Sequence, residues 1–188
     1  MIWHDHSRLS GSHSLLSPSS GSWVNYTPEK LVQFYINQQR KAMGTKLHAL
    51  AETCIKLSQR LPDNNSTMSR FVNDALGYRM NPEQTLYYSP NFFGTADAIS
   101  FDLASRVLRI HDLKTGVTPG KLIQLEIYAA LFFLEYGLKP GDSFSIILRI
   151  YQNDEIVEWE PDPTDIMRIM GTIVAHDKIL EEIQNQKG

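Results

Sequence analysis

Helical and strand-like spacings of hydrophobic residues alternate along this chain of 188 residues and predict a protein of mixed helices and strands. Helical periodicity and capping residues predict helices over residues 28–40, 43–61, 66–78, 121–136 and 162–186. Two-residue alternation predicts strands over residues 143–151 and 156–160, and two further strands within residues 94–116. Residues 85–93 predict a strand that Pro90 interrupts, hence an edge strand or a bend. Strands interleaved with helices in this order predict an α/β fold.

The two strands within residues 94–116 carry the most informative pattern. A turn at residues 104–105 would form two apolar pairs on one face, Phe101 with Leu108 and Ile99 with Ile110. The next pair on that face is Asp97 with Asp112, and Lys114 follows one step further along the second strand. Directly opposite residues lie about 5 Å apart, where two carboxylates repel by roughly 3 kcal/mol at an effective dielectric constant of about 20. A divalent cation would offset that repulsion, although three solvated charges at a strand end would give the same pattern.

A second pair of polar residues lies on the predicted helix 43–61. The apolar residues of this helix recur at spacings of three and four and predict a buried stripe of Met43, Leu47, Leu50, Cys54, Leu57 and Leu61. His48 and Glu52 are four residues apart, so they stack on one helix face beside that stripe. Such a position at the edge of a stripe can face a cleft, and it also suits an ordinary histidine–glutamate pair on a helix surface.

The composition excludes several kinds of protein. The single cysteine, Cys54, excludes an internal disulfide and any four-cysteine zinc or iron–sulfur site within one chain. No apolar run approaches the roughly 20 residues needed to span a bilayer, and the first residues lack the pattern of a signal peptide. We expect one domain over residues 1–188, with residues 1–22 as a loosely packed arm, in a cytoplasmic setting and without membrane association.

The charges are unevenly distributed along the chain, whose net charge is −3. Residues 8–60 contain seven Lys and Arg against two Glu, whereas residues 151–188 contain nine Asp and Glu against three Lys and Arg. A basic N-terminal half would suit contact with the phosphates of a nucleic acid. Solvated helix faces would produce similar counts.

Four short polar motifs follow one another on the predicted elements: H-x-x-x-E on a helix, G-x-x-D and D-x-K on strands, and Q-x-x-x-Y on a helix. They occur in the segments G-T-K-L-H-A-L-A-E-T, G-T-A-D-A-I, H-D-L-K-T-G and Q-L-E-I-Y-A. This order resembles the PD-(D/E)XK nuclease superfamily, in its RecB-like and phage-exonuclease branch. The early segment H-S-L-L-S-P-S-S resembles the start of phage-encoded members, so the resemblance covers residues 12–136.

The resemblance implies a restriction-endonuclease-like core, with a central mixed β-sheet flanked by helices, and a centre for Mg²⁺ or Mn²⁺. By this resemblance Asp97 and Asp112 would be metal ligands, with His48 as a third ligand and the carbonyl of Leu113 as a fourth. Glu52 would hold a second metal ion or its waters. The four cysteines of the iron–sulfur relatives are absent, so the resemblance implies no cluster.

The same resemblance implies roles for three further residues. Lys114 would orient or deprotonate the attacking water and stabilise developing charge. Gln124 and Tyr128, four residues apart on the predicted helix 121–136, would position Lys114 or contact the scissile strand.

The function implied is that of a metal-dependent DNA exonuclease that hydrolyses phosphodiester bonds from DNA ends, in phage recombination or replication within the host cytoplasm. Two alternatives stay open: a structure-specific or single-strand endonuclease, and a non-catalytic DNA-binding or inhibitory protein that keeps the fold. A small chain would need a homo-oligomer, a single-strand annealing protein or a helicase for processive action.

Overall fold

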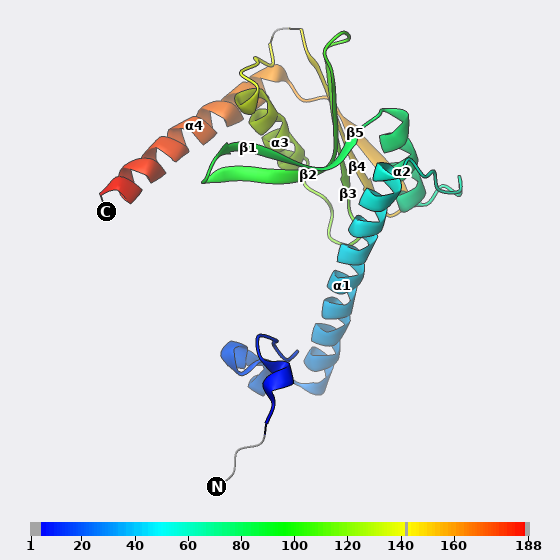
Figure 1. Cartoon of the computed structure of the whole chain (residues 1–188), viewed down its shortest axis with the longest axis vertical. Helices are drawn as coiled ribbons and strands as arrows, with labels where there is room; N and C mark the ends of the chain where they lie inside the picture. The colour runs from blue at the N-terminus through cyan, green and yellow to red at the C-terminus, as the bar shows by residue number, and fades with distance from the viewer. Residues whose placement is uncertain (1–4, 142, 187–188) are drawn as a thin grey trace. The chain divides into compact units, whose positions relative to one another are not determined.

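The computed structural model describes residues 5–141 and 143–186 (Figure 1). The chain divides into two compact units, Met1–Ala42 and Met43–Gly188, and each is described by itself. Across the described residues, no helix is both long enough and apolar enough to cross a membrane.

The first unit contains two 3₁₀ segments, η1 (Ser7–Leu9) and η2 (Pro18–Asn25), and the first half of helix α1 (Pro28–Lys56). Its contacts are local: the ring of Tyr26 packs against that of Phe34, with centroids 5.7 Å apart.

The prediction of two helices, over residues 28–40 and 43–61, is wrong, because α1 is one continuous helix. Residues 41–43 are Lys, Ala and Met, which favour helix and supply no break.

The buried face of α1 also differs from the predicted stripe. Met43, Leu50 and Leu57 of that stripe are exposed, whereas Cys54 is buried as predicted. The buried positions of α1 are Gly44, Ala51, Cys54 and Ile55. Small residues at this face let the helix approach its neighbours closely, and that tertiary demand outweighs the amphipathic pattern.

The second unit is built on a five-stranded sheet whose order follows the sequence. The strands are β1 (Asn81–Ser89), β2 (Phe92–Asp102), β3 (Val107–Leu113), β4 (Ser145–Gln152) and β5 (Glu155–Trp159). β3 and β4 are parallel and the other neighbours are antiparallel, so the sheet is mixed. The predicted α/β class, a mixed sheet flanked by helices, is confirmed.

The register predicted for the hairpin β2–β3 is confirmed, with Phe101 opposite Leu108 and Ile99 opposite Ile110. The predicted strand start at residue 85 is wrong, because β1 begins at Asn81. The interruption predicted at Pro90 is confirmed, because Pro90 lies in the turn between β1 and β2. Proline suits that turn because it cannot donate to a strand ladder.

Helices cover both faces of the sheet (Figure 1). On one face α3 (Leu122–Glu135), the helix that connects β3 to β4, packs with α4 (Pro163–Asn185) over a core that includes Leu108, Ile110 and Leu148. On the other face α2 (Thr67–Gly77) and the end of α1 pack over a second core that includes Tyr151. The predicted helix starts at Ser66 and Asp162 are confirmed, since each side chain caps its helix.

Candidate metal centre

Asp97 lies where β2 separates from β3. The last paired residues of the two strands are Ala98 and His111. Beyond them, the backbone N–H of Leu113 donates a hydrogen bond of 2.7 Å to Oδ2 of Asp97. The carboxylate of Asp97 thus takes the place of a backbone acceptor in the ladder, and this hydrogen bond holds it in position. Its other oxygen, Oδ1, stays available for a second partner.

That second partner is His48, on the part of α1 that belongs to the second unit. Nδ1 of His48 lies 3.5 Å from Oδ1 of Asp97. Hydrogen bonding to Asp97 raises the pKa of the His48 imidazole, with further contributions from the charges of Asp97, Glu83 and Asp112, while burial acts in the opposite direction. The structure therefore brings together two of the residues that the sequence motifs single out.

The third member of this cluster is Glu83, which the sequence analysis did not identify. Ligand atoms of His48, Glu83 and Asp97 all lie within 4.8 Å of one another, an arrangement that could hold a metal ion. Glu83 has φ of 48°, a conformation that non-glycine residues adopt rarely and at a cost. Burial raises the pKa of the Glu83 carboxyl, and the charge of Asp97 raises it further.

Asp112 and Lys114 form an adjoining arrangement that reaches α3. Nζ of Lys114 lies 3.1 Å from each carboxylate oxygen of Asp112 and donates to Oε1 of Gln124 at 3.1 Å. Nε2 of Gln124 donates in turn to the hydroxyl of Tyr128 at 3.2 Å. All four residues singled out by the D-x-K and Q-x-x-x-Y motifs therefore lie in one chain of polar contacts.

The surroundings of the Asp112 carboxylate indicate whether a cation could bind beside it. This carboxylate is buried, and the ammonium group of Lys114 lies 3.1 Å from each of its oxygens, as a hydrogen bond to Oδ1 and an ion pair with Oδ2. Burial raises the pKa of this carboxyl, and the charge of Asp97 raises it further, against the lowering effect of Lys114. A buried carboxylate near the carboxylates of Glu83 and Asp97 and the imidazole of His48 offers the kind of ligands that a hard divalent cation accepts.

Two glycines make room for this arrangement. A Cβ on Gly94 would lie 2.8 Å from the ring of Tyr128, and a Cβ on Gly44 would lie 2.7 Å from Oγ1 of Thr115. Gly94 therefore lets β2 approach α3, and Gly44 lets α1 approach the residue that follows Lys114. The glycine of the G-x-x-D motif thus has a packing reason in this chain.

Of the predicted metal ligands, Asp112, Glu52 and Leu113 lie outside the cluster of His48, Glu83 and Asp97. Glu52 pairs with Lys56 at 2.5 Å and is close enough to Glu83 for its charge to raise the pKa of that carboxyl. Leu113 contributes its N–H to Asp97, and its predicted role as a carbonyl ligand stays a prediction. In the register of β1 and β2, Gln84 is opposite Ala96 and Pro82 is opposite Ala98, which places Glu83 opposite Asp97. A correct prediction of this register would have identified Glu83 as a site residue.

A groove of about 560 Å³ adjoins Lys114. Its lining includes Phe93 and Gly94 of β2, Lys121, and Gln124 and Tyr128 of α3. Ile123 and Ile127 of α3 are exposed and line this groove. The groove gives a substrate of some length a path to the polar cluster.

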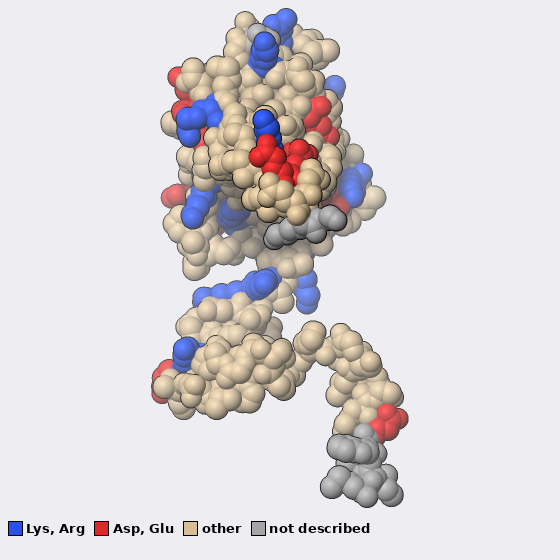
Figure 2. Space-filling model, turned by 90° about the vertical axis from the view of Figure 1, so that its left-hand side faces the viewer, with Lys and Arg blue, Asp and Glu red and all other residues tan. Residues whose placement is uncertain are grey.

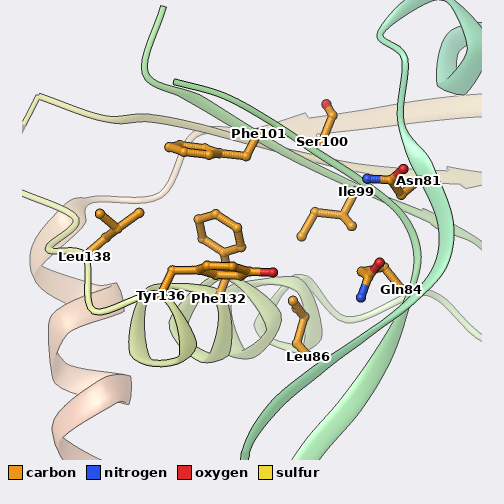
Figure 3. Close-up of a pocket in the computed structure, with 9 residues that line it drawn as sticks. All are labelled: Asn81, Gln84, Leu86, Ile99, Ser100, Phe101, Phe132, Tyr136 and Leu138. Carbon is orange, nitrogen blue, oxygen red and sulfur yellow. The ribbon is translucent and has the colours of Figure 1, made fainter. Parts of the chain in front are cut away.

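A separate cavity of about 380 Å³ lies between β1, β2 and the end of α3 (Figure 3). Figure 3 shows the rings of Phe101, Phe132 and Tyr136 around it, with the amides of Asn81 and Gln84 to one side. Its lining consists of apolar and neutral polar residues. It therefore lacks the acids and bases that hydrolysis needs.

Acidic side chains gather at the C-terminal end of α4 on the face shown in Figure 2. Glu181 and Glu182 are exposed there. An anionic substrate would be repelled by this end of the helix, whereas Lys114 and Lys121 lie at the groove.

The chain was also compared with known proteins. No family model matches it, and no curated protein matches it. A solved structure described as "Crystal structure of SSO0001" matches 74% of this chain and 86% of that chain, with 14% identity and a TM-score of 0.31. Similarity at that level carries no argument about fold or function.

Proposed function

We propose that this chain is a metal-dependent deoxyribonuclease that hydrolyses phosphodiester bonds at DNA ends, with Mg²⁺ or Mn²⁺ as its cofactor. One observation carries the proposal: Lys114 is held at 3.1 Å from Asp112 and from Gln124, beside the cluster of His48, Glu83 and Asp97. The resemblance of the four motifs to PD-(D/E)XK nucleases supports the same reading. A binding module has no need of grouped acids around a fixed lysine, which disfavours a non-catalytic protein.

The residues divide the chemistry between them. When bound, a divalent cation supplies charge neutralisation on the phosphate and makes a water molecule more acidic. His48, Glu83, Asp97 and Asp112 would hold that cation. They offer one imidazole and three carboxylates, donors that divalent cations accept.

Lys114 would act on the water and the phosphate. Its ammonium group has three N–H donors, and Asp112 and Gln124 accept two of them. The remaining donor would orient the water whose oxygen attacks phosphorus, or stabilise charge on the phosphate as the bond to the leaving oxygen breaks. Tyr128 would act through Gln124, so it would be a positioning residue.

Action at ends is favoured over internal cleavage because the described residues of the second unit form one sheet with its covering helices, with no added domain for sequence readout. Processive action would then require a homo-oligomer or a partner such as an annealing protein or helicase. Internal cleavage by a structure-specific endonuclease is the competing function.

The test is digestion of DNA in linear and covalently closed circular forms, with Mg²⁺ and with excess EDTA. We expect loss of the linear DNA only, and only with the metal. Lys114→Ala should lower turnover at least about a hundred-fold, the usual cost of removing one transition-state donor, while DNA binding persists. The matched control is Lys56→Ala, which removes a lysine paired with Glu52. Cleavage in EDTA, or full turnover by Lys114→Ala, would contradict the proposal, and equal rates on both DNA forms would favour an endonuclease.

A further inference from the structure

The β1–β2 hairpin carries an exposed aromatic pair near the candidate metal centre. Tyr87 of β1 lies opposite Phe93 of β2, and their rings stack with centroids 6.4 Å apart and planes 29° apart. The two residues are 49% and 62% exposed. Large aromatic rings held rigidly in contact with water are typical of a binding surface.

A row of side chains joins this pair to the metal centre. Thr85 and Thr95 form the next outward-facing pair, with hydroxyls 3.2 Å apart, and Glu83 and Asp97 follow in the same register. A strand rises about 3.4 Å per residue, so Phe93 lies roughly 14 Å along β2 from Asp97. That distance corresponds to a few nucleotides of an extended strand.

Phe93 also lines the groove that contains Lys114 and Lys121. Lys121 is exposed, and its ammonium group complements a phosphate. An aromatic ring and a cation that line one groove match the two parts of a nucleotide, its base and its phosphate.

We propose that the Tyr87–Phe93 pair is a stacking platform for the bases of an unpaired DNA strand whose end reaches the metal centre. That the end of this strand is cleaved at the metal centre rests on the proposed function. Within a duplex the bases stack on one another and only the terminal pair exposes a face, whereas every unpaired base can offer its face to a protein ring. The platform thus selects single-stranded DNA, or a single-stranded overhang, over a blunt duplex.

The test measures binding without hydrolysis. The probes are a labelled oligo(dT) of about 20 nucleotides, longer than a typical single-strand site, and a blunt duplex of the same length, both in EDTA, with fluorescence anisotropy as readout. Phe93→Ala and Tyr87→Ala should each weaken binding of oligo(dT) roughly tenfold, as loss of one stacked base does, and leave duplex binding unchanged. Phe93→Trp should restore it. Leu103→Ala, which removes an apolar residue 71% exposed at the β2–β3 turn, is the matched control and should bind as wild type.

Wild-type binding of oligo(dT) by both alanine variants would overturn the platform, and so would an equal loss in the Leu103→Ala control or an equal loss of duplex binding. The two proposals fail separately. A protein that shows Phe93-dependent binding but cuts no DNA with Mg²⁺ would retain the platform and refute the nuclease. A protein that cuts DNA, but whose Phe93→Ala variant binds oligo(dT) as wild type does, would refute only the platform.

Discussion

The backbone N–H of Leu113 donates a 2.7 Å hydrogen bond to Oδ2 of Asp97 across the point where β2 leaves β3. This bond ties the two strands together where their ladder has ended. It also turns Oδ1 of Asp97 toward His48. One carboxylate therefore serves the fold with one oxygen and the candidate metal centre with the other.

This division predicts the behaviour of Asp97→Asn. The amide oxygen can still accept from Leu113, so the variant should fold as wild type, and loss of the charge relieves repulsion with Asp112. Affinity for Mn²⁺ should fall at least about tenfold. Loss of a residue that only orients a metal ligand lowers metal affinity by about ten- to a hundred-fold, and loss of a ligand should lower it no less. Calorimetric titration with Mn²⁺ and thermal unfolding in EDTA measure the two effects. An unchanged Mn²⁺ affinity would remove Asp97 from the site.

A second prediction distinguishes Glu83 from Glu52. Only Glu83 lies within the cluster of His48 and Asp97, whereas Glu52 pairs with Lys56. Glu83→Gln should therefore weaken Mn²⁺ binding about tenfold or more, and Glu52→Gln should change it less than about threefold. The same calorimetric titration on both variants decides the point, and a larger effect at Glu52 would favour the ligand set implied by the resemblance.

The sequence was sufficient for features that depend on near neighbours. The β2–β3 register followed from two-residue alternation and one short turn, and the helix starts at Ser66 and Asp162 followed from capping chemistry. Asp97 and Asp112 were identified in this way as neighbouring charges, although the ladder ends at Ala98 and His111 and does not pair them directly.

Features that depend on tertiary contacts were missed. The start of β1 was missed because Pro82 is unusual within a strand and the positive φ of Glu83 does not follow from the sequence. Glu83, the residue opposite Asp97, was missed with it. The buried face of α1 is set by close packing at Gly44 and Ala51, which hydrophobic spacing does not report. Nothing in the local sequence indicates that Asp74 would meet Tyr151 across the second core.

The close approach of Gly44 to Thr115 gives a third prediction. A Cβ at residue 44 would lie 2.7 Å from Oγ1 of Thr115, so the Thr115 side chain, α1 or the residues after Lys114 must shift. Gly44→Ala should lower turnover about ten- to a hundred-fold, because small displacements of positioned groups cost that much. The double variant Gly44→Ala, Thr115→Ala removes the obstructing oxygen and should recover activity. Gly171→Ala on α4, where nothing lies within 4 Å of the new Cβ, is the control.

The last prediction concerns His111, which is fully buried on the second-core face of β3. The hydroxyl of Tyr151 donates to Asp74 at 2.7 Å, so it accepts from Nδ1 of His111 at 3.2 Å, and among the described residues Nε2 has no partner. Burial, with the charges of Arg149 and Arg109, lowers the pKa of this imidazole from 6.5 to about 3.

Because the folded pKa of His111 is lowered, the unfolded chain binds one more proton between pH 6.5 and about 3, and stability falls as the pH falls through that window. From pH 7.5 to pH 5 the loss due to this residue is about 2 kcal/mol of unfolding free energy. Asp112 and Glu83 have raised pKa values and act in the opposite sense.

The prediction therefore concerns the difference in unfolding free energy between wild type and His111→Leu, measured by urea unfolding in EDTA at both pH values. The variant should lose about 2 kcal/mol less than wild type on acidification, with His176→Leu, an exposed histidine on α4, as control. Equal losses in wild type and His111→Leu would show that His111 does not become harder to protonate on folding.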